Sequence, residues 1–302
     1  MNSIQKLLIP LGVAAAVPTG FATGIAYPKR WSMEASFREE KDKGYLRDYP
    51  DWHKIHFTTT SYDGYRLQCE YLPYPAGSNK FVILSHGYTY TRFGSVKYAH
   101  FFRKHGFNVV LYDNRGHGEN RRTKVTLGVR EARDLIALID KLRDTYGKDI
   151  RIGLHGESMG AGIQVQALQY HPNIDFVICD CGFSHLAKVY EDLANEKAPG
   201  FGELLVRPAA EVSKLLYGFS YYDVNPIDYL KANDVPLLFM HGEKDDLVSP
   251  EHSIRMHEAN KGYSELHLFP GSGHAMSWAD QPDEYEAIEE AFLKTVDPAL
   301  LV

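Results

Sequence analysis

Residues 155–162 read HGESMGAG and place Ser158 between Gly156 and Gly160 at the spacing G-x-S-x-G, directly after the apolar run IRIGL at 150–154. A serine in a Gly-rich corner between a strand and a helix can simply cap the helix. The other interpretation is a nucleophile raised on a sharp turn, which requires a base, an acid and oxyanion donors elsewhere in the chain. The remaining sequence therefore has to supply those groups.

Composition excludes several classes of protein. The chain has 302 residues, enough for one large domain with an insertion. Its formal net charge is -6 and it contains no long basic run, so we exclude nucleic acid as a partner. The three cysteines, Cys69, Cys179 and Cys181, have no metal-ligand spacing, and we expect no disulfide framework, no metal and no cofactor.

The amino terminus, residues 1–30, is a hydrophobic segment. Residues 7–27 carry no charge, and their number just suffices to cross a bilayer. Only Lys6 precedes this run, whereas five basic residues follow within 29–43, which places the following domain in the cytoplasm if the run is inserted. We therefore favour a membrane anchor and membrane contact through 7–27. A signal peptide of a secreted protein, or a helix packed on a soluble domain, are the alternatives.

Residues 48–302 show the alternation of an α/β domain. Residues 53–75 read as a hairpin hinged at Asp63-Gly64. Apolar runs follow at 81–85, 108–113, 150–154, 175–180, 236–240 and 265–269, and helical periodicity appears at 128–147, 159–170 and 283–296. Short apolar strands alternating with helices predict a doubly wound, mostly parallel sheet with helices on both faces.

One interval, 183–235, breaks this alternation. It lacks a buried-strand pattern, reads as helical and contains four clustered aromatic residues, Tyr217, Phe219, Tyr221 and Tyr222. A connection this long in a compact α/β domain is usually functional, so we interpret it as a lid over the carboxyl ends of the strands. We expect Tyr221 and Tyr222 to line its substrate pocket. A plain helical crossover is the alternative.

The groups that Ser158 needs are present in the chain. His274 lies in the Gly-rich loop after 265–269 and is the best base, and a histidine base needs an acid to hold its tautomer. Asp245, in the loop after 236–240, is the favoured acid, with Asp246 and Asp180 as alternatives. Serine, acid and histidine each end a different strand, so they can meet at one edge of the sheet.

The oxyanion donors come from two backbone N–H groups. Met159 follows the nucleophile at the start of a helix, and Tyr88 follows the run 81–85 in LSHGYTYTR. Gly156 and Gly160 let the backbone of the turn and the following helix approach closely.

With these motifs, SHGYT, LYDNRGHGEN, GESMGAG, HGEKDDLVSP and GSGHA over 81–296, the chain resembles the α/β-hydrolase superfamily, specifically the bacterial serine-aminopeptidase-like serine hydrolases. The resemblance implies an eight-stranded sheet, a cap between the sixth and seventh strands, and a Ser158, Asp245, His274 triad. The oxyanion loop reads His-Gly-Tyr-Thr, not the His-Gly-Gly-Gly of hormone-sensitive-lipase-like esterases, so we do not import the substrates of those enzymes.

The expected function is therefore that of a serine esterase. We expect Ser158 to form an acyl-enzyme with carboxylic esters of short to medium, uncharged acyl chains. A thioesterase, peptidase or acyltransferase would use the same residues. A catalytically silent binding protein with this fold is the alternative from another class.

Overall fold

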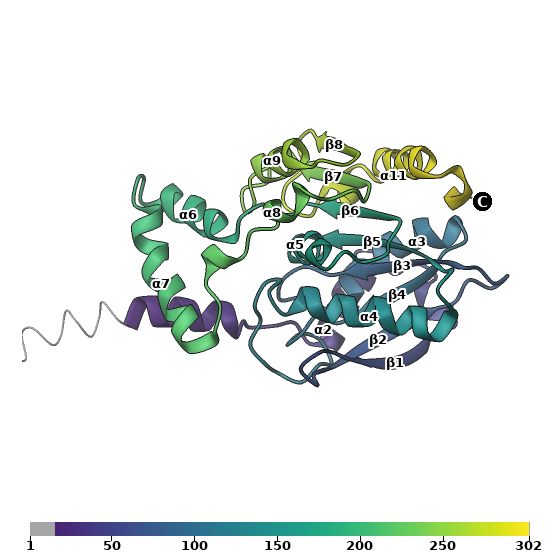
Figure 1. Ribbon diagram of the computed structural model, residues 1–302, viewed down its shortest axis with the longest axis horizontal. Coiled ribbons are helices and arrows are strands. Elements are labelled where there is room, and N and C mark those ends of the chain that lie inside the picture. The colour runs from purple at the N-terminus through teal and green to yellow at the C-terminus, as the bar shows by residue number, and fades with distance from the viewer. Residues whose placement is uncertain (1–15, 302) are drawn as a thin grey trace, which may run out of the picture.

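The computed structural model describes residues 16–301, which form one mostly parallel eight-stranded sheet with helices on both faces (Figure 1). Its strand order is β1-β2-β4-β3-β5-β6-β7-β8. The pairs β1–β2 and β2–β4 are antiparallel, and all other pairs are parallel. The strands are β1 Ile55–Thr60, β2 Arg66–Leu72, β3 Lys80–Ser85, β4 Asn108–Tyr112, β5 Arg151–Glu157, β6 Phe176–Asp180, β7 Leu237–Gly242 and β8 Ser264–Phe269.

Both faces of the sheet are buried, as the continuous apolar runs predict. In β3, Phe81 and Ile83 contribute to one core while Val82 and Leu84 contribute to the other, because successive side chains point to opposite faces. Helices α4 (Glu131–Tyr146), α5 (Met159–Ala167) and α9 (Glu251–Ala259) pack in the first core. Helices α3 (Val96–Lys104), α10 (Ser277–Asp280) and α11 (Pro282–Val296) pack in the second, with α2 (Met33–Asp42) beside it.

Between β6 and β7 the chain forms a helical insertion without a strand. It consists of α6 (Leu186–Lys197), α7 (Gly202–Tyr217), the short turn η4 (Tyr221–Asp223) and α8 (Ile227–Leu230). Figure 1 shows α6 and α7 projecting away from the sheet. Buried residues of α6, α7 and η4 join the core that also contains α4 and α5, so the insertion is packed onto the domain as a cap.

Residues 16–26 form a helix that lies against this cap, at the lower left of Figure 1. The ring of Phe21 makes edge contacts with Tyr190 and Tyr221, and Thr23 Oγ1 lies 2.7 Å from the hydroxyl oxygen of Tyr217. Three interpretations of the amino terminus were a membrane anchor, a signal peptide and a helix packed on the domain. For residues 16–26 the structure shows the packed helix. The rest of the expected anchor, 7–15, lies outside the described residues.

The link from this helix to the domain is also packed and hydrogen-bonded. The N–H of Trp31 donates to the carbonyl of Thr89, and Arg30 donates to the carbonyls of Gly116 and Asn120. Across residues 16–301, no helix is both long enough and apolar enough to span a bilayer.

Candidate active site

Ser158 occupies a strained turn between β5 and α5. Its backbone has φ 54° and ψ -115°, outside the regions that residues with a side chain prefer. The turn is tight because the two glycines allow close contact: a Cβ on Gly160 would collide with the carbonyl oxygen of Ser85, and one on Gly156 would collide with the backbone of Gly160. The sharp turn predicted from G-x-S-x-G is present.

The hydroxyl of Ser158 bonds to a histidine and does not cap α5. Ser158 Oγ lies 2.9 Å from His274 Nε2, and His274 Nδ1 lies 2.7 Å from Asp245 Oδ2. Because a carboxylate can only accept, Nδ1–H donates to Asp245 and leaves Nε2 to accept the proton of the serine hydroxyl. The structure thus brings the three predicted residues into one chain of hydrogen bonds.

Asp245 is the acid that this geometry selects. It is buried, and its Oδ1 accepts hydrogen bonds from the backbone N–H groups of Leu247 and Val248. Burial raises the pKa of Asp245, but the hydrogen bonds from His241 and His274 outweigh it and hold the pKa below its ordinary value. Asp245 is therefore a carboxylate that can stabilise an imidazolium.

The two alternative acids lie elsewhere. Asp246 is exposed and points to the cavity under the cap. Asp180 accepts hydrogen bonds from the hydroxyls of Tyr98 and Tyr285, and burial raises its pKa to about 6. Among residues 16–301, neither of these carboxylates is hydrogen-bonded to His274.

The side chain of His274 is partly accessible to solvent, with 18 % of its surface exposed. Burial lowers its pKa, but the hydrogen bond and charge of Asp245 outweigh burial, and the pKa of His274 lies above its ordinary value of 6.5. His274 thus combines the proton affinity of a base with access to a bound molecule.

The predicted oxyanion donors belong to two segments next to Ser158: Met159 is the following residue, and Gly87 of the other segment packs against Ser158. A Cβ built on Gly87 would lie 3.7 Å from the Cβ of Ser158, so the backbone of Gly87 is next to the serine. Tyr88 is the residue after Gly87. Within the described part of the chain, no acceptor takes a hydrogen bond from the backbone N–H of Tyr88 or Met159. These two groups are therefore available to a bound oxyanion.

A buried lysine, which sequence reasoning did not find, ties the loops of the site together. Lys97 Nζ lies 2.6 Å from Glu157 Oε2 and donates to the carbonyl oxygen of Ala275 at 3.4 Å. Glu157 precedes Ser158 and Ala275 follows His274, so Lys97 fixes the nucleophile turn relative to the histidine loop. The only sequence signal is a lysine in a helix whose other residues are largely apolar.

A cavity of about 660 Å³ lies under the cap, next to the loop of Asp245. Three elements line it: the helix 16–26, the cap helices α6 and α7, and the loop after β7. Its wall is mainly apolar and includes Val17, Pro18, Phe21, Tyr190, Leu193, Ala194, Leu205, Val206, Ala209 and Leu247, with Asp246, Glu196 and Lys197 as the charged members.

Tyr221 and Tyr222, the expected pocket residues, do not line this cavity. Tyr221 is fully buried behind Tyr190, with the two ring centroids 5.1 Å apart. Tyr222 donates its hydroxyl to Glu191 at 2.6 Å. The aromatic residues that line the cavity are Tyr190 and Phe21. Phe21 belongs to the helix 16–26, and the sequence did not predict that this helix packs on the cap.

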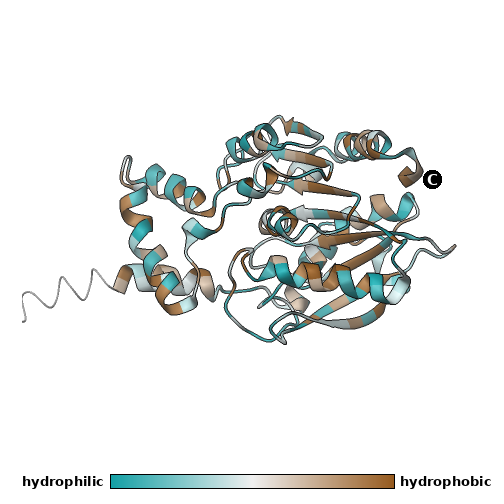
Figure 2. Cartoon of the chain, in the orientation of Figure 1, coloured by the Kyte–Doolittle hydropathy of each residue, from teal (hydrophilic) through white to brown (hydrophobic). Residues whose placement is uncertain are grey.

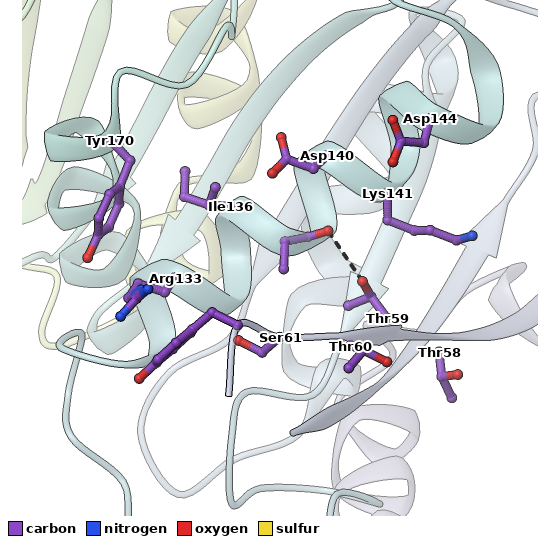
Figure 3. Close-up of a pocket in the computed structure, with 12 residues that line it drawn as sticks. Thr58, Thr59, Thr60, Ser61, Arg133, Ile136, Asp140, Lys141, Asp144 and Tyr170 are labelled. Carbon is purple, nitrogen blue, oxygen red and sulfur yellow. Dashed lines mark hydrogen bonds between the residues drawn. The ribbon is translucent and has the colours of Figure 1, made fainter. Parts of the chain in front are cut away.

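A second cavity, of about 620 Å³, lies between β1 and α4 (Figure 3). Its lining includes Thr58–Thr60 on the strand side and Arg133, Asp140 and Lys141 on α4, and Thr59 donates to the carbonyl of Ala137 there. It contains none of the predicted site residues.

The described residues contain one trio whose side-chain atoms are close enough to share a cation, within 4.8 Å of one another: Cys181, Asp245 and His274. Burial raises the pKa of the Cys181 thiol well above its ordinary value, so this sulfur is a protonated, weak ligand. Asp245 and His274 already bond to each other. This donor set fits a hydrogen-bonded acid and base better than a metal site.

The chain is similar in sequence to known proteins. Residues 77–215 match the serine aminopeptidase family S33. The chain is 29 % identical to the uncharacterized protein YqkD of Bacillus subtilis, over 97 % of this chain and 99 % of that protein.

Solved structures extend the likeness to the whole fold. An esterase of Pyrococcus furiosus, Pf2001, superposes with a TM-score of 0.70 at 26 % identity, over 90 % of this chain and 98 % of that one. An acylaminoacyl peptidase of Pyrococcus horikoshii, at 18 % identity and a TM-score of 0.62, shares the fold over 83 % of this chain and 42 % of that one. The resemblance predicted from the motifs is confirmed: the chain has the α/β-hydrolase fold and is similar to esterases and to the serine aminopeptidase family.

Proposed function

We propose that this protein is a serine hydrolase that cleaves carboxylic esters through an acyl-enzyme on Ser158. The observation that carries the proposal is the chain of hydrogen bonds from Ser158 Oγ to His274 Nε2 and from His274 Nδ1 to Asp245 Oδ2. A serine hydroxyl is a weak nucleophile, and it becomes a strong one when a positioned base removes its proton.

The residues act in a simple order. As Ser158 Oγ attacks the acyl carbon, His274 Nε2 takes the hydroxyl proton and Asp245 stabilises the imidazolium. The carbonyl oxygen becomes an oxyanion that accepts hydrogen bonds from the N–H groups of Tyr88 and Met159. His274 then gives its proton to the leaving alcohol. In the second half, His274 takes a proton from water as the water oxygen attacks the acyl carbon. The bond between that carbon and Ser158 Oγ then breaks, His274 returns the proton to Ser158, and the carboxylic acid is released.

The cavity under the cap supports an apolar acyl group. Each methylene buried against its wall contributes about 0.8 kcal/mol until the cavity is full, which favours short to medium chains over acetate. A charged acyl group would lose hydration against the apolar part of the wall, which includes Phe21, Tyr190 and Leu193. The similarity to the Pyrococcus furiosus esterase supports an ester as the bond that is cleaved.

A labelling experiment tests the mechanism. A fluorophosphonate probe should modify the full-length protein at Ser158, and Ser158→Ala should remain unlabelled. Ser253→Ala is the matched control, because Ser253 also bonds a histidine, His241, but is fully buried. Labelling that persists in Ser158→Ala would reject Ser158 as the nucleophile, and absence of labelling in the wild type would favour a silent binding protein.

A substrate panel tests the bond and the acyl group. The panel consists of p-nitrophenyl esters from acetyl to dodecanoyl, a thioester series and aminoacyl amides. We expect the highest kcat/KM on esters of intermediate length. A higher kcat/KM on the thioesters or amides would assign the same site to a thioesterase or peptidase.

A further inference from the structure

The cap helix α7 exposes a continuous apolar face. Successive residues of a helix advance by about 100°, so residues four, seven and eleven apart lie on one side. The exposed or half-buried apolar residues of this side, called here the α7 stripe, are Phe201, Leu204, Leu205, Pro208, Val212, Leu215 and Leu216. Leu204 is 68 % exposed and Leu215 is 84 % exposed. Figure 2 shows the hydrophobic residues at both ends of the helix.

The other two sides of α7 have ordinary roles. Val206, Ala209, Ala210 and Ser213 are buried against the cap, and these four positions hold the helix in place. The charged side carries Glu203, Arg207, Glu211 and Lys214, with Arg207 paired to Glu203. The packing of the cap therefore does not require the α7 stripe, and isolated surface leucines would not occupy one side of a helix over its whole length.

The stripe continues across the cavity mouth onto the amino-terminal helix. Leu205 belongs to the stripe and also lines the cavity together with Val17 and Phe21. Val17 is itself 68 % exposed. The chain that precedes Ala16 joins the helix one residue before Val17, and its residues 7–15, LLIPLGVAA, contain no charge. The stripe and the helix 16–26 thus adjoin each other at the cavity.

We propose that the α7 stripe, together with Val17 and Phe21, docks on the interfacial region of a lipid bilayer, with α7 lying in the membrane plane. An amphipathic helix with leucine and phenylalanine on one side and charges on another is suited to this position. The stripe is the outer side of one projecting helix, α7. A flat apolar phase such as the bilayer interface can contact the whole length of this side. The cavity lies at the edge of the stripe and beside the loop of Asp245, so an ester could enter it from the lipid, a consequence that rests on the proposed function.

The charges around the stripe predict which lipids matter. Its flank carries two acidic residues, Glu203 and Glu211, and two basic ones, Arg207 and Lys214, so it offers no net attraction to anionic headgroups. Docking should depend on apolar burial, and binding to zwitterionic and anionic vesicles should be similar. High salt should leave it nearly unchanged, because salt screens charges and does not weaken apolar burial.

Vesicle flotation of the full-length chain tests the proposal. Vesicles of phosphatidylcholine, and of phosphatidylcholine with about one quarter phosphatidylglycerol, are compared at about 0.1 M and about 0.5 M NaCl. The stripe variant is Leu204→Gln with Leu215→Gln, both exposed, so folding is retained. The control variant is Ile55→Gln with Tyr263→Gln, two exposed apolar residues of 42 % and 46 % on other parts of the surface. Circular dichroism checks that all proteins are folded.

We expect the wild type and the control to float with both vesicles, and the stripe variant to bind at least about ten-fold more weakly. A wild type that does not float overturns the proposal, as does a stripe variant that binds as the wild type does. Binding that requires phosphatidylglycerol and disappears in high salt also overturns it. A dimer in solution that the stripe variant dissociates, without vesicle binding, would assign the surface to a second copy of the chain. Flotation needs no turnover and can use Ser158→Ala, so failure of the proposed hydrolysis is a separate result.

Discussion

Asp245 Oδ2 accepts hydrogen bonds from two histidines, and each of them bonds a serine. On one side His274 lies 2.7 Å from the carboxylate and 2.9 Å from Ser158 Oγ. On the other side His241 lies 3.1 Å from the same oxygen and 2.7 Å from Ser253 Oγ. Judged by hydrogen bonds alone, the molecule contains two Ser–His–Asp chains that share one acid.

The two chains differ in access and in backbone. His241 and Ser253 are fully buried, and Ser253 lies inside α9 with helical backbone. Ser158 lies on a strained turn with the free N–H groups of Tyr88 and Met159 nearby, and His274 is partly exposed. The comparison teaches that a half-buried, strained turn with oxyanion donors, more than the hydrogen-bonded trio, distinguishes a nucleophile from a fully buried polar contact.

The largest expected effect comes from removing the two serines in turn. Ser158→Ala should lower kcat for ester hydrolysis on the order of 10⁴-fold or more with little change in melting temperature, because the serine is the attacking group and contributes little to packing. Ser253→Ala should retain kcat within a few fold and lose stability, because it leaves His241 Nδ1 buried without a partner. Residual activity of Ser158→Ala above about a tenth of wild type would remove Ser158 from the mechanism.

The acid shared by the two chains can be compared with its neighbour. Asp245→Asn should lower kcat by about 10⁴-fold, because only the residue bonded to the imidazole fixes its tautomer. Asp246→Asn removes an exposed carboxylate and should change kcat by no more than a few fold. Steady-state kinetics of both variants measure this difference, and equal effects would reassign the acid.

The pH profile isolates His274. A general base must be neutral in the free enzyme, and the pKa of His274 lies above 6.5, so kcat/KM should rise with pH through that raised pKa and become level above it. Below the pKa it should fall about ten-fold per pH unit. In Asp245→Asn the hydrogen bond and charge that raise the pKa are lost, and the midpoint of the residual activity should move to lower pH. A midpoint that moves upward would contradict the assignment of Asp245.

Cap variants should produce a smaller effect that is confined to the acyl group. Phe21→Ala widens the cavity and should shift the preferred ester by one or two methylenes, a change of a few fold in the ratio of kcat/KM values. Tyr222→Ala removes a ring that bonds Glu191 outside the cavity wall and should leave the preference unchanged. The p-nitrophenyl ester series measures both. If the preferred acyl length changes in Tyr222→Ala and not in Phe21→Ala, Tyr222 lines the acyl pocket, as the sequence predicts.

No effect is expected from chelators. EDTA should leave kcat unchanged, because the Cys181 thiol stays protonated and Asp245 and His274 bond each other. Loss of activity with EDTA, restored by a divalent ion, would identify the Cys181, Asp245, His274 trio as a cation site.

Much of the site is predictable because its signals are local. Gly156 and Gly160 define the turn by their spacing from Ser158, and Asp245 and His274 each follow an apolar strand in a short loop. Parallel strands end at the same edge of a sheet, so residues far apart in the chain meet once the strands are recognised. Lys97 and His241 have no such signal, because their roles depend on groups that only folding brings within hydrogen-bond distance.

The sequence by itself determined the sheet, the nucleophile turn and the order of serine, acid and histidine, because apolar periodicity and glycine spacing act within a few residues of each position. Tertiary structure alone decided the packing of residues 16–26 and the lining of the cavity. Residues 16–26 have a composition that suits either lipid or protein, and the cap supplies Tyr190 and Tyr221 as ring contacts and Tyr217 as a hydrogen-bond partner. The same packing turned Tyr222 toward Glu191 and left Phe21 in the cavity wall, since burial is a property of neighbours that are distant in sequence.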